Sequence, residues 1–199
     1  YAAVPTKIGY DKWSDISAGG WHTCGIQEDG TLYCWGKNEF GGLGDGSYDD
    51  KPVPTKIDDS SWVEISAGGD HTCGIKNDNS LYCWGRSIEG QVGNERSGLG
   101  ADESVPVKIG EEEWRLVSAG SLHTCGIRND SSLYCWGDNR NGQLGDGTSG
   151  INMKKTVPEK IGNDSWIDVR SGKGKNENHT CGIRKDSSLY CWGSNDHGQ

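Results

Sequence analysis

Eight cysteines and the histidines close to them are the residues of this chain whose types and spacing could support chemistry. The cysteines form four pairs with nine residues between partners: Cys24 and Cys34, Cys73 and Cys83, Cys125 and Cys135, and Cys181 and Cys191. A histidine stands two positions before the first cysteine of each pair, so each unit could supply three ligands to zinc. Three ligands are too few for a structural zinc site, and the spacing is unlike that of common zinc modules. Disulfide bonds are therefore the favoured reading.

A β-hairpin would position each cysteine pair. Residues 22–26 and 32–36 flank a polar turn centred on Asp29. In that register Cys24 lies directly opposite Cys34, at a separation that a disulfide can bridge. Each histidine is then expected to be a buried side chain that ties its strand to a neighbouring loop.

Strand alternation gives the hairpin two different faces. One face carries His22, Cys24, Ile26, Leu32 and Cys34, and the other carries Thr23, Tyr33 and Trp35. Both faces are worth burying, which is expected of a small sheet packed between two similar sheets. Tyr33 lies opposite Gly25, and its ring is expected to cover that glycine.

The same hairpin recurs about every 50 residues, following Trp13, Trp62, Trp114 and Trp166. The chain has 32 Gly, 9 Trp and 7 Tyr but one Phe and one Met, so short strands packed through aromatic rings are favoured over helices. The predicted fold class is all-β, with tandem four-stranded antiparallel blades in a propeller-like ring or an open arc. We expect one repeat domain over residues 1–199, divided into a closing strand of a preceding repeat (1–12), repeats 1 to 3 (13–61, 62–113 and 114–165) and an incomplete repeat 4 (166–199).

The motifs of the repeat resemble those of the regulator of chromosome condensation repeat. They are Trp114-x-x-Val117-Ser118-Ala119-Gly120, His123-Thr124, Leu133-Tyr134, Trp136-Gly137-Asp138-Asn139 and Gly142-Gln143-Leu144-Gly145. The resemblance implies a β-propeller, usually of seven blades, that presents a face or rim to another protein. Two features depart from that family: there are four repeats, and each carries a cysteine pair that the best-known intracellular members lack.

Cysteine usage and charge restrict the setting in which this chain works. Four disulfides would indicate a secreted, periplasmic or cell-surface location, and the chain opens at Tyr1 without an initiator Met, which indicates a processed or partial chain. A formal net charge of -9 disfavours nucleic acid as a partner. The sequence has no apolar stretch of about 20 residues that could insert into a membrane. Three sequons are candidate sites for N-glycans, at Asn129, Asn163 and Asn178.

A catalytic site should break the repeat, and no constellation does so; we predict no enzyme activity, no cofactor and no metal. The two Gly-Asp-Gly segments, 44–46 and 145–147, are expected to be turns. The polar insertion of repeat 4 is the best candidate contact loop, because binding residues concentrate on loops held by a rigid frame. Its candidate residues are Lys173, Lys175, Asn176 and Glu177.

Two functional readings follow. In the first, the chain is an extracellular structural subunit in which residues 1–12 of one copy supply the closing strand that repeat 4 of another copy lacks, so that a fibre can grow. In the second, it is a secreted protein-binding propeller module, as part of a longer propeller. A regulator of the guanine-nucleotide exchange type is less favoured.

Overall fold

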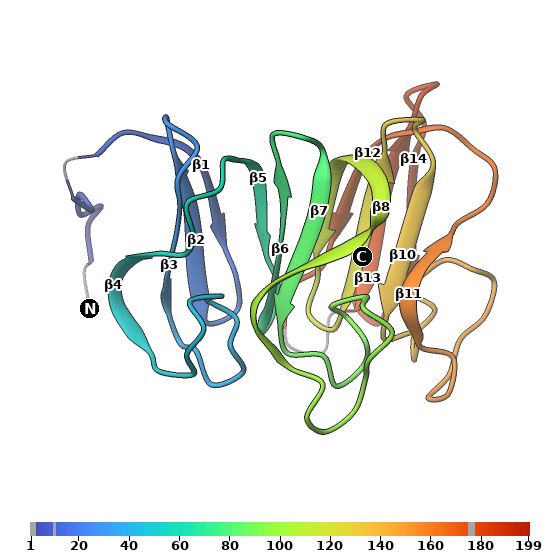
Figure 1. Ribbon diagram of the computed structural model, residues 1–199. Helices are drawn as coiled ribbons and strands as arrows, with labels where there is room; N and C mark the ends of the chain where they lie inside the picture. Colours follow the sequence, from blue (N-terminus) through green and yellow to red (C-terminus); the bar gives the residue numbers. More distant parts are fainter. Residues whose placement is uncertain (1–2, 10, 175–177) are drawn as a thin grey trace.

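The structure is a computed structural model that describes residues 3–9, 11–174 and 178–199, and all its regular elements are β-strands. The strands are β1 (Trp13–Ala18), β2 (His22–Gln27), β3 (Leu32–Gly36), β4 (Lys51–Lys56), β5 (Trp62–Ala67), β6 (His71–Lys76), β7 (Ser80–Gly85), β8 (Glu103–Ala119), β9 (His123–Arg128), β10 (Leu133–Gly137), β11 (Lys155–Lys160), β12 (Trp166–Ser171), β13 (His179–Arg184) and β14 (Leu189–Gly193). They form four antiparallel blades that follow one another in chain order (Figure 1). Among the described residues, no helix is long and apolar enough to cross a membrane.

The blades differ in how their strands are joined. Blade 1 is a sheet of four strands, β1 to β4, and blade 4 has only three, β12 to β14. Blades 2 and 3 share one seven-stranded sheet, because β8 pairs with β7 through its first part and with β9 through its last part. The sequence had indicated separate four-stranded blades at this point. Residues 111–113 remain extended instead, so that the closing strand of blade 2 continues directly into the first strand of blade 3.

The predicted hairpin register is confirmed. In blade 1 Cys24 pairs with Cys34, and Ile26 pairs with Leu32. The turn is built by Asp29, whose carboxylate accepts the N–H of Thr31 at 2.9 Å. A left-handed residue follows the aspartate in each turn: Gly30, Asn79, Ser131 and Ser187, with φ between 64° and 86°.

Each of the four cysteine pairs is joined by a disulfide, with Cα atoms 4.1 Å apart in every case. The described residues contain no free cysteine. We call the side of a blade that carries its two cysteines, Ile and Leu the cysteine face, and the side that carries its two Trp and its Tyr the tryptophan face.

The core lies between blades, where the cysteine face of one blade packs against the tryptophan face of the next. Cys24, Ile26 and Leu32 of blade 1 form a buried cluster with Trp62 and Trp84 of blade 2. The same arrangement recurs between blades 2 and 3 and between blades 3 and 4. For the hairpins of blades 2 and 3, this confirms that both faces are buried by like neighbours.

The ring that covers the strand glycine is not the predicted one. The tryptophan that opens the repeat, and not the tyrosine opposite, lies against Gly25: a Cβ atom on this glycine would stand 2.9 Å from Cε3 of Trp13. Tyr33 instead packs edge-on against Trp13, with ring centroids 5.8 Å apart. The bare glycine therefore makes room for a ring from the adjacent strand, and the contact recurs in all four blades.

Candidate protein-interaction surface

His22, His71 and His123 each tie their blade to the next one. His71 Nε2 lies 2.9 Å from Thr124 Oγ1 of the next blade, and this threonine donates to the carbonyl of Gln91 at 2.8 Å. Because the hydroxyl hydrogen is used in that bond, the histidine must be the donor to the threonine oxygen. Equivalent relays start at His22 and His123. Burial lowers the pKa of His71 and His123 to about 3.

The relay accounts for His22, His71 and His123 without zinc, and the sulfurs of all four cysteine pairs are held in disulfides. Among the residues that the structure describes, no group of three His, Cys, Asp or Glu side chains is placed to hold a metal ion. The Gly-Asp-Gly segments are also structural. Asp45 accepts hydrogen bonds from Asn38 and Ser47 and pairs with Lys51 at 3.2 Å, which organises its own loop.

The two end faces of the described chain, the tryptophan face of blade 1 and the cysteine face of blade 4, are more exposed than the same faces inside the molecule. On the cysteine face of blade 4, Leu189 is 68% exposed and Cys191 is exposed as well, whereas Leu32, Leu81 and Leu133, the equivalents of Leu189, are fully buried. On blade 1, the tryptophan face of Trp13, Tyr33 and Trp35 is partly open and lines a cavity of about 440 Å³ together with Lys7 and Ile8. The two end faces are thus the two halves of an interface that the chain builds three times internally.

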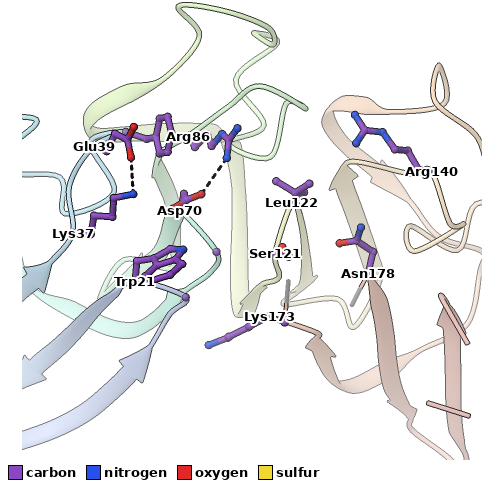
Figure 2. Close-up of a pocket in the computed structure, with 14 residues that line it drawn as sticks. Trp21, Lys37, Glu39, Asp70, Arg86, Ser121, Leu122, Arg140, Lys173 and Asn178 are labelled. Atoms are coloured by element: carbon purple, nitrogen blue, oxygen red, sulfur yellow. Dashed lines mark hydrogen bonds and ion pairs between the residues drawn. The ribbon is translucent and has the colours of Figure 1, made fainter. Parts of the chain in front are cut away.

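A larger cavity, of about 670 Å³, lies on the side of the molecule where the loops of all four blades converge (Figure 2). We call it the loop-face cavity. The loops after β1, β5, β8 and β12 line it, together with the loops after β3, β7 and β10. Its side chains are those of Trp21, Lys37, Glu39, Phe40, Asp70, Arg86, Ser121, Leu122, Arg140, Lys173 and Asn178.

The backbone of this surface is the same in every blade, whereas its side chains are not. The residue before each repeated histidine accepts a hydrogen bond, through its carbonyl, from the N–H of the residue after the repeated Trp-Gly. The four pairs are Trp21 with Lys37, Asp70 with Arg86, Leu122 with Asp138, and Asn178 with Ser194, at 2.9 to 3.0 Å. Because the backbone bond is the same in all four blades while the residue types differ, packing within the blade does not determine which side chain stands at these positions.

Among the residues of the cavity, aromatic rings and cations are paired. Trp21 is 64% exposed and has the ammonium of Lys37 5.7 Å from its ring centroid. The guanidinium of Arg86 lies 4.5 Å from the ring centroid of Phe40 and bonds Asp70 at 3.2 Å. Sequence reasoning missed this group; the signal that could have found it is the variation between repeats at the position before the histidine.

Of the four residues predicted to form a contact loop, Lys173 lines this surface; Gly174 and Asn178 of the same insertion line it too. Lys173 donates to Ser17 Oγ at 3.3 Å and to the carbonyl of Ala18 at 3.4 Å, so it connects blade 4 to blade 1. Burial lowers its pKa, and the charge of Arg170 adds to this effect. Lys173 also lines a second cavity, of about 420 Å³, on the side of β1, β5, β8 and β12. The other candidates, Lys175, Asn176 and Glu177, lie outside the described residues.

The three sequon asparagines lie in different settings. Asn129 and Asn163 are exposed, and Asn129 donates to Glu113 at 2.8 Å. Asn178 is only 8% exposed and lines the loop-face cavity. Its side chain is therefore not at the exposed position that was expected of a glycan carrier, because the carbonyl of Asn178 is held by Ser194 within the blade.

The chain was compared with known proteins. It is 26% identical to the human E3 ubiquitin-protein ligase HERC2, covering 91% of this chain and 4% of the relative. It is 30% identical to the ultraviolet-B receptor UVR8 of Arabidopsis thaliana, covering 92% of this chain and 42% of the relative. The chain spans less than half of the length of these curated relatives.

Solved structures of propellers superimpose on the fold. Yeast RCC1 (Prp20) bound to Kap60 matches with a TM-score of 0.78 and 22% identity, over 96% of this chain and 46% of the solved one. The ectodomain of the Arabidopsis thaliana receptor kinase ACR4 matches with a TM-score of 0.55 and 24% identity, over 92% of this chain and 51% of the solved one.

Family models agree with the motifs and with the repeated geometry. The model described as the regulator of chromosome condensation (RCC1) repeat matches residues 29–75, 78–127 and 130–181. A second model of the same description matches residues 13–41, 62–91, 114–143 and 176–199. With these matches over most of its length, the chain belongs to the family of regulator of chromosome condensation (RCC1) repeats.

Proposed function

We propose that this chain is a non-enzymatic protein-interaction scaffold that works outside the reducing cytosol and joins other copies of itself end to end. An RCC1-repeat propeller points to an interaction module, and the observation that carries the finer proposal is the complementarity of the two end faces. Blade 4 exposes a cysteine face, and blade 1 exposes part of a tryptophan face. Inside the chain these two faces bury each other three times.

Strand complementation would complete such a junction. Residues 4–8 have the sequence Val-Pro-Thr-Lys-Ile, which repeats at residues 53–57, where β4 pairs with β3 of blade 1. Blade 4 has no strand on the outer side of β14 in the described chain. Residues 4–8 of one copy can therefore add to β14 of the next copy as its fourth strand. A head-to-tail contact of this kind propagates when its rotation does not close.

Sedimentation velocity and electron microscopy of the purified chain test the assembly. We expect particles far heavier than the chain mass of 21.5 kDa, as arcs, rings or filaments. Leu189→Glu places a charge in the centre of the junction and should return the material to monomers. Ile151→Glu is the matched control, since Ile151 is 74% exposed and belongs to neither end face. A wild-type chain that remains monomeric at concentrations of about 100 μM would refute self-assembly.

Four disulfides support the proposed location, because they persist in oxidising compartments. The similarity in fold to a receptor-kinase ectodomain supports it as well. Mass spectrometry of material from the native source checks it: four intact disulfides are expected, and eight free thiols would overturn the proposal. Glycans, where the source attaches them, are expected on Asn129 and Asn163 and not on Asn178.

The loop-face cavity favours a second candidate function, that of a secreted protein-binding module. Its exposed tryptophan and paired arginines are residue types enriched in interface hot spots. The regulator of the exchange-factor type has less support, since the net charge of -9 and the disulfides argue against a nuclear factor bound to chromatin.

A further inference from the structure

We propose that the loop-face cavity binds an acidic segment of a partner protein, with an apolar side chain of that segment packed on Trp21 and a carboxylate paired with Lys173. This inference goes beyond end-to-end assembly, because it concerns a surface that neither end face includes. Three independent features of the described residues support it: the charge balance, the position of Lys173, and the aromatic group beside it.

The described lining of the cavity is more basic than the chain as a whole. It holds four cations, Lys37, Arg86, Arg140 and Lys173, and two carboxylates, Glu39 and Asp70. Two further carboxylates, of Glu89 and Asp138, pair with Arg140 from outside the lining, so the cation whose charge is left without a described carboxylate is Lys173. The chain as a whole carries a formal net charge of -9. A basic lining in an acidic molecule gives a local positive potential, which attracts an anionic partner and disfavours a basic one.

Lys173 differs from the other three cations in its partners. Lys37 pairs with Glu39, Arg86 with Asp70, and Arg140 with Glu89 and Asp138. The ammonium of Lys173 bonds a hydroxyl and a carbonyl, and no described carboxylate lies within 4 Å of it. Figure 2 shows Lys173 at the base of the cavity, with its side chain directed toward the first blade. A half-buried ammonium with neutral partners gains most from an added carboxylate.

The aromatic group supplies the apolar part of the site. Trp21 is 64% exposed although every other described tryptophan is at least partly buried. Leu122 and Phe40 line the same cavity, so a side chain that enters it can be desolvated on several sides. The loops that carry these residues are tied to their blades by the repeated backbone bond, so the surface is already formed before a partner arrives.

Selection from a random library of displayed peptides of about twelve residues tests the inference without a known partner. The wild-type chain is the target, and the selected consensus is synthesised, labelled and titrated by fluorescence anisotropy. We expect peptides rich in Asp and Glu with at least one aromatic or aliphatic anchor. Their affinity should fall as the salt concentration rises, because the charged groups become screened.

Two variants and two matched controls locate the binding. Trp21→Ala and Lys173→Gln should each weaken the consensus peptide by about tenfold. Tyr48→Ala, at an aromatic residue that is 55% exposed elsewhere, and Lys185→Gln, on the turn of blade 4, should change the affinity by less than about twofold. Near-ultraviolet circular dichroism of each variant confirms that the blades remain packed.

Neutral or basic consensus peptides, equal binding to all variants, or a selection that yields no binder would each overturn the inference. Particle mass, measured on the same samples, separates it from the proposed function. Trp21→Ala should leave end-to-end assembly unchanged, and Leu189→Glu should leave peptide binding unchanged. The two proposals can therefore fail one at a time.

Discussion

Blades 3 and 4 contain the same hairpin, His-Thr-Cys-Gly-Ile-Arg followed by Leu-Tyr-Cys-Trp-Gly, in two different surroundings. In blade 3 its leucine, Leu133, is fully buried under Trp166 and Trp192 of the next blade. In blade 4 the same leucine, Leu189, is 68% exposed. Identical residues in an identical register therefore differ in burial because of what surrounds them: Leu133 has a following blade and a closing strand, and Leu189 has neither within the described residues. Much of the stability of this fold therefore resides in the junctions between blades, as expected for repeat proteins.

Lowering the pH should reduce the free energy of unfolding more than any of the substitutions below, through the buried histidines of the covered hairpins. Burial lowers the pKa of His71 and His123 to about 3, and burial with the charge of Lys173 lowers that of His22 to about 4. The unfolded chain therefore binds more protons than the folded one below about pH 6.5, so stability is lost as the pH falls. At pH 4 each fully buried histidine should lower the free energy of unfolding by about 3 kcal/mol relative to pH 7.

Glu64 opposes this trend. Burial raises its pKa to about 7, so the folded state gains stability from it as the pH falls toward about 4.5. The three histidines outweigh one glutamate, and urea unfolding should show a net loss of several kcal/mol between pH 7 and pH 4. His71→Gln should make the slope clearly shallower. A free energy of unfolding that is flat over this range would contradict the buried relays.

Truncating the leucine in the two hairpins gives the most direct contrast. Leu133→Ala removes a fully buried side chain and should lower the free energy of unfolding by about 3 kcal/mol, because it leaves a cavity between two blades. Leu189→Ala should cost less than about 0.5 kcal/mol in the monomeric chain. Thermal or urea unfolding measures both at a concentration where no assembly occurs. Equal losses would show that the cysteine face of blade 4 is covered in solution.

Breaking one of the histidine–threonine relays should lower the free energy of unfolding by less than Leu133→Ala does. Thr180→Val removes the acceptor for His123 and the donor to the carbonyl of Gln143, and should cost about 1 to 2 kcal/mol, since buried polar groups are left unpaired. Thr23→Val is the matched control: no histidine of a preceding blade reaches it within the described residues, so the change should be near zero. If both substitutions cost the same, the bond to histidine contributes nothing to the junction.

The four disulfides should differ in how readily a reductant reaches them. Cys125 and Cys135 are fully buried, whereas Cys191 of the last blade is exposed. Mild dithiothreitol treatment followed by alkylation should label the pair Cys181–Cys191 first. The global free energy of unfolding should change little, because one face of blade 4 packs against blade 3 and the face that carries this disulfide is not covered by another described blade. Peptide mapping reads the order. Simultaneous reduction of all four pairs would contradict it.

The features of this protein that could be predicted from its sequence depend on local spacing. Nine residues between cysteines and a turn centred on Asp29 set the hairpin register, since only one pairing places Cys24 opposite Cys34, and alternation then assigned the two faces. The histidine tie was also predictable, as a buried polar group needs a partner. The identity of the partner could not be predicted: His22 bonds Thr72 of the next blade, which lies 50 residues away along the chain.

The features that depend on how the blades meet could not be predicted from local spacing and were found in the three-dimensional structure. It continued β8 from blade 2 into blade 3, and it laid Trp13 rather than Tyr33 against Gly25. It also brought Trp21, Arg86 and Lys173, which belong to three different repeats, into one cavity. Periodicity specifies what each blade contains, whereas the relative placement of blades follows from packing between residues far apart in sequence. A surface formed by loops of successive blades exists only after that packing is complete.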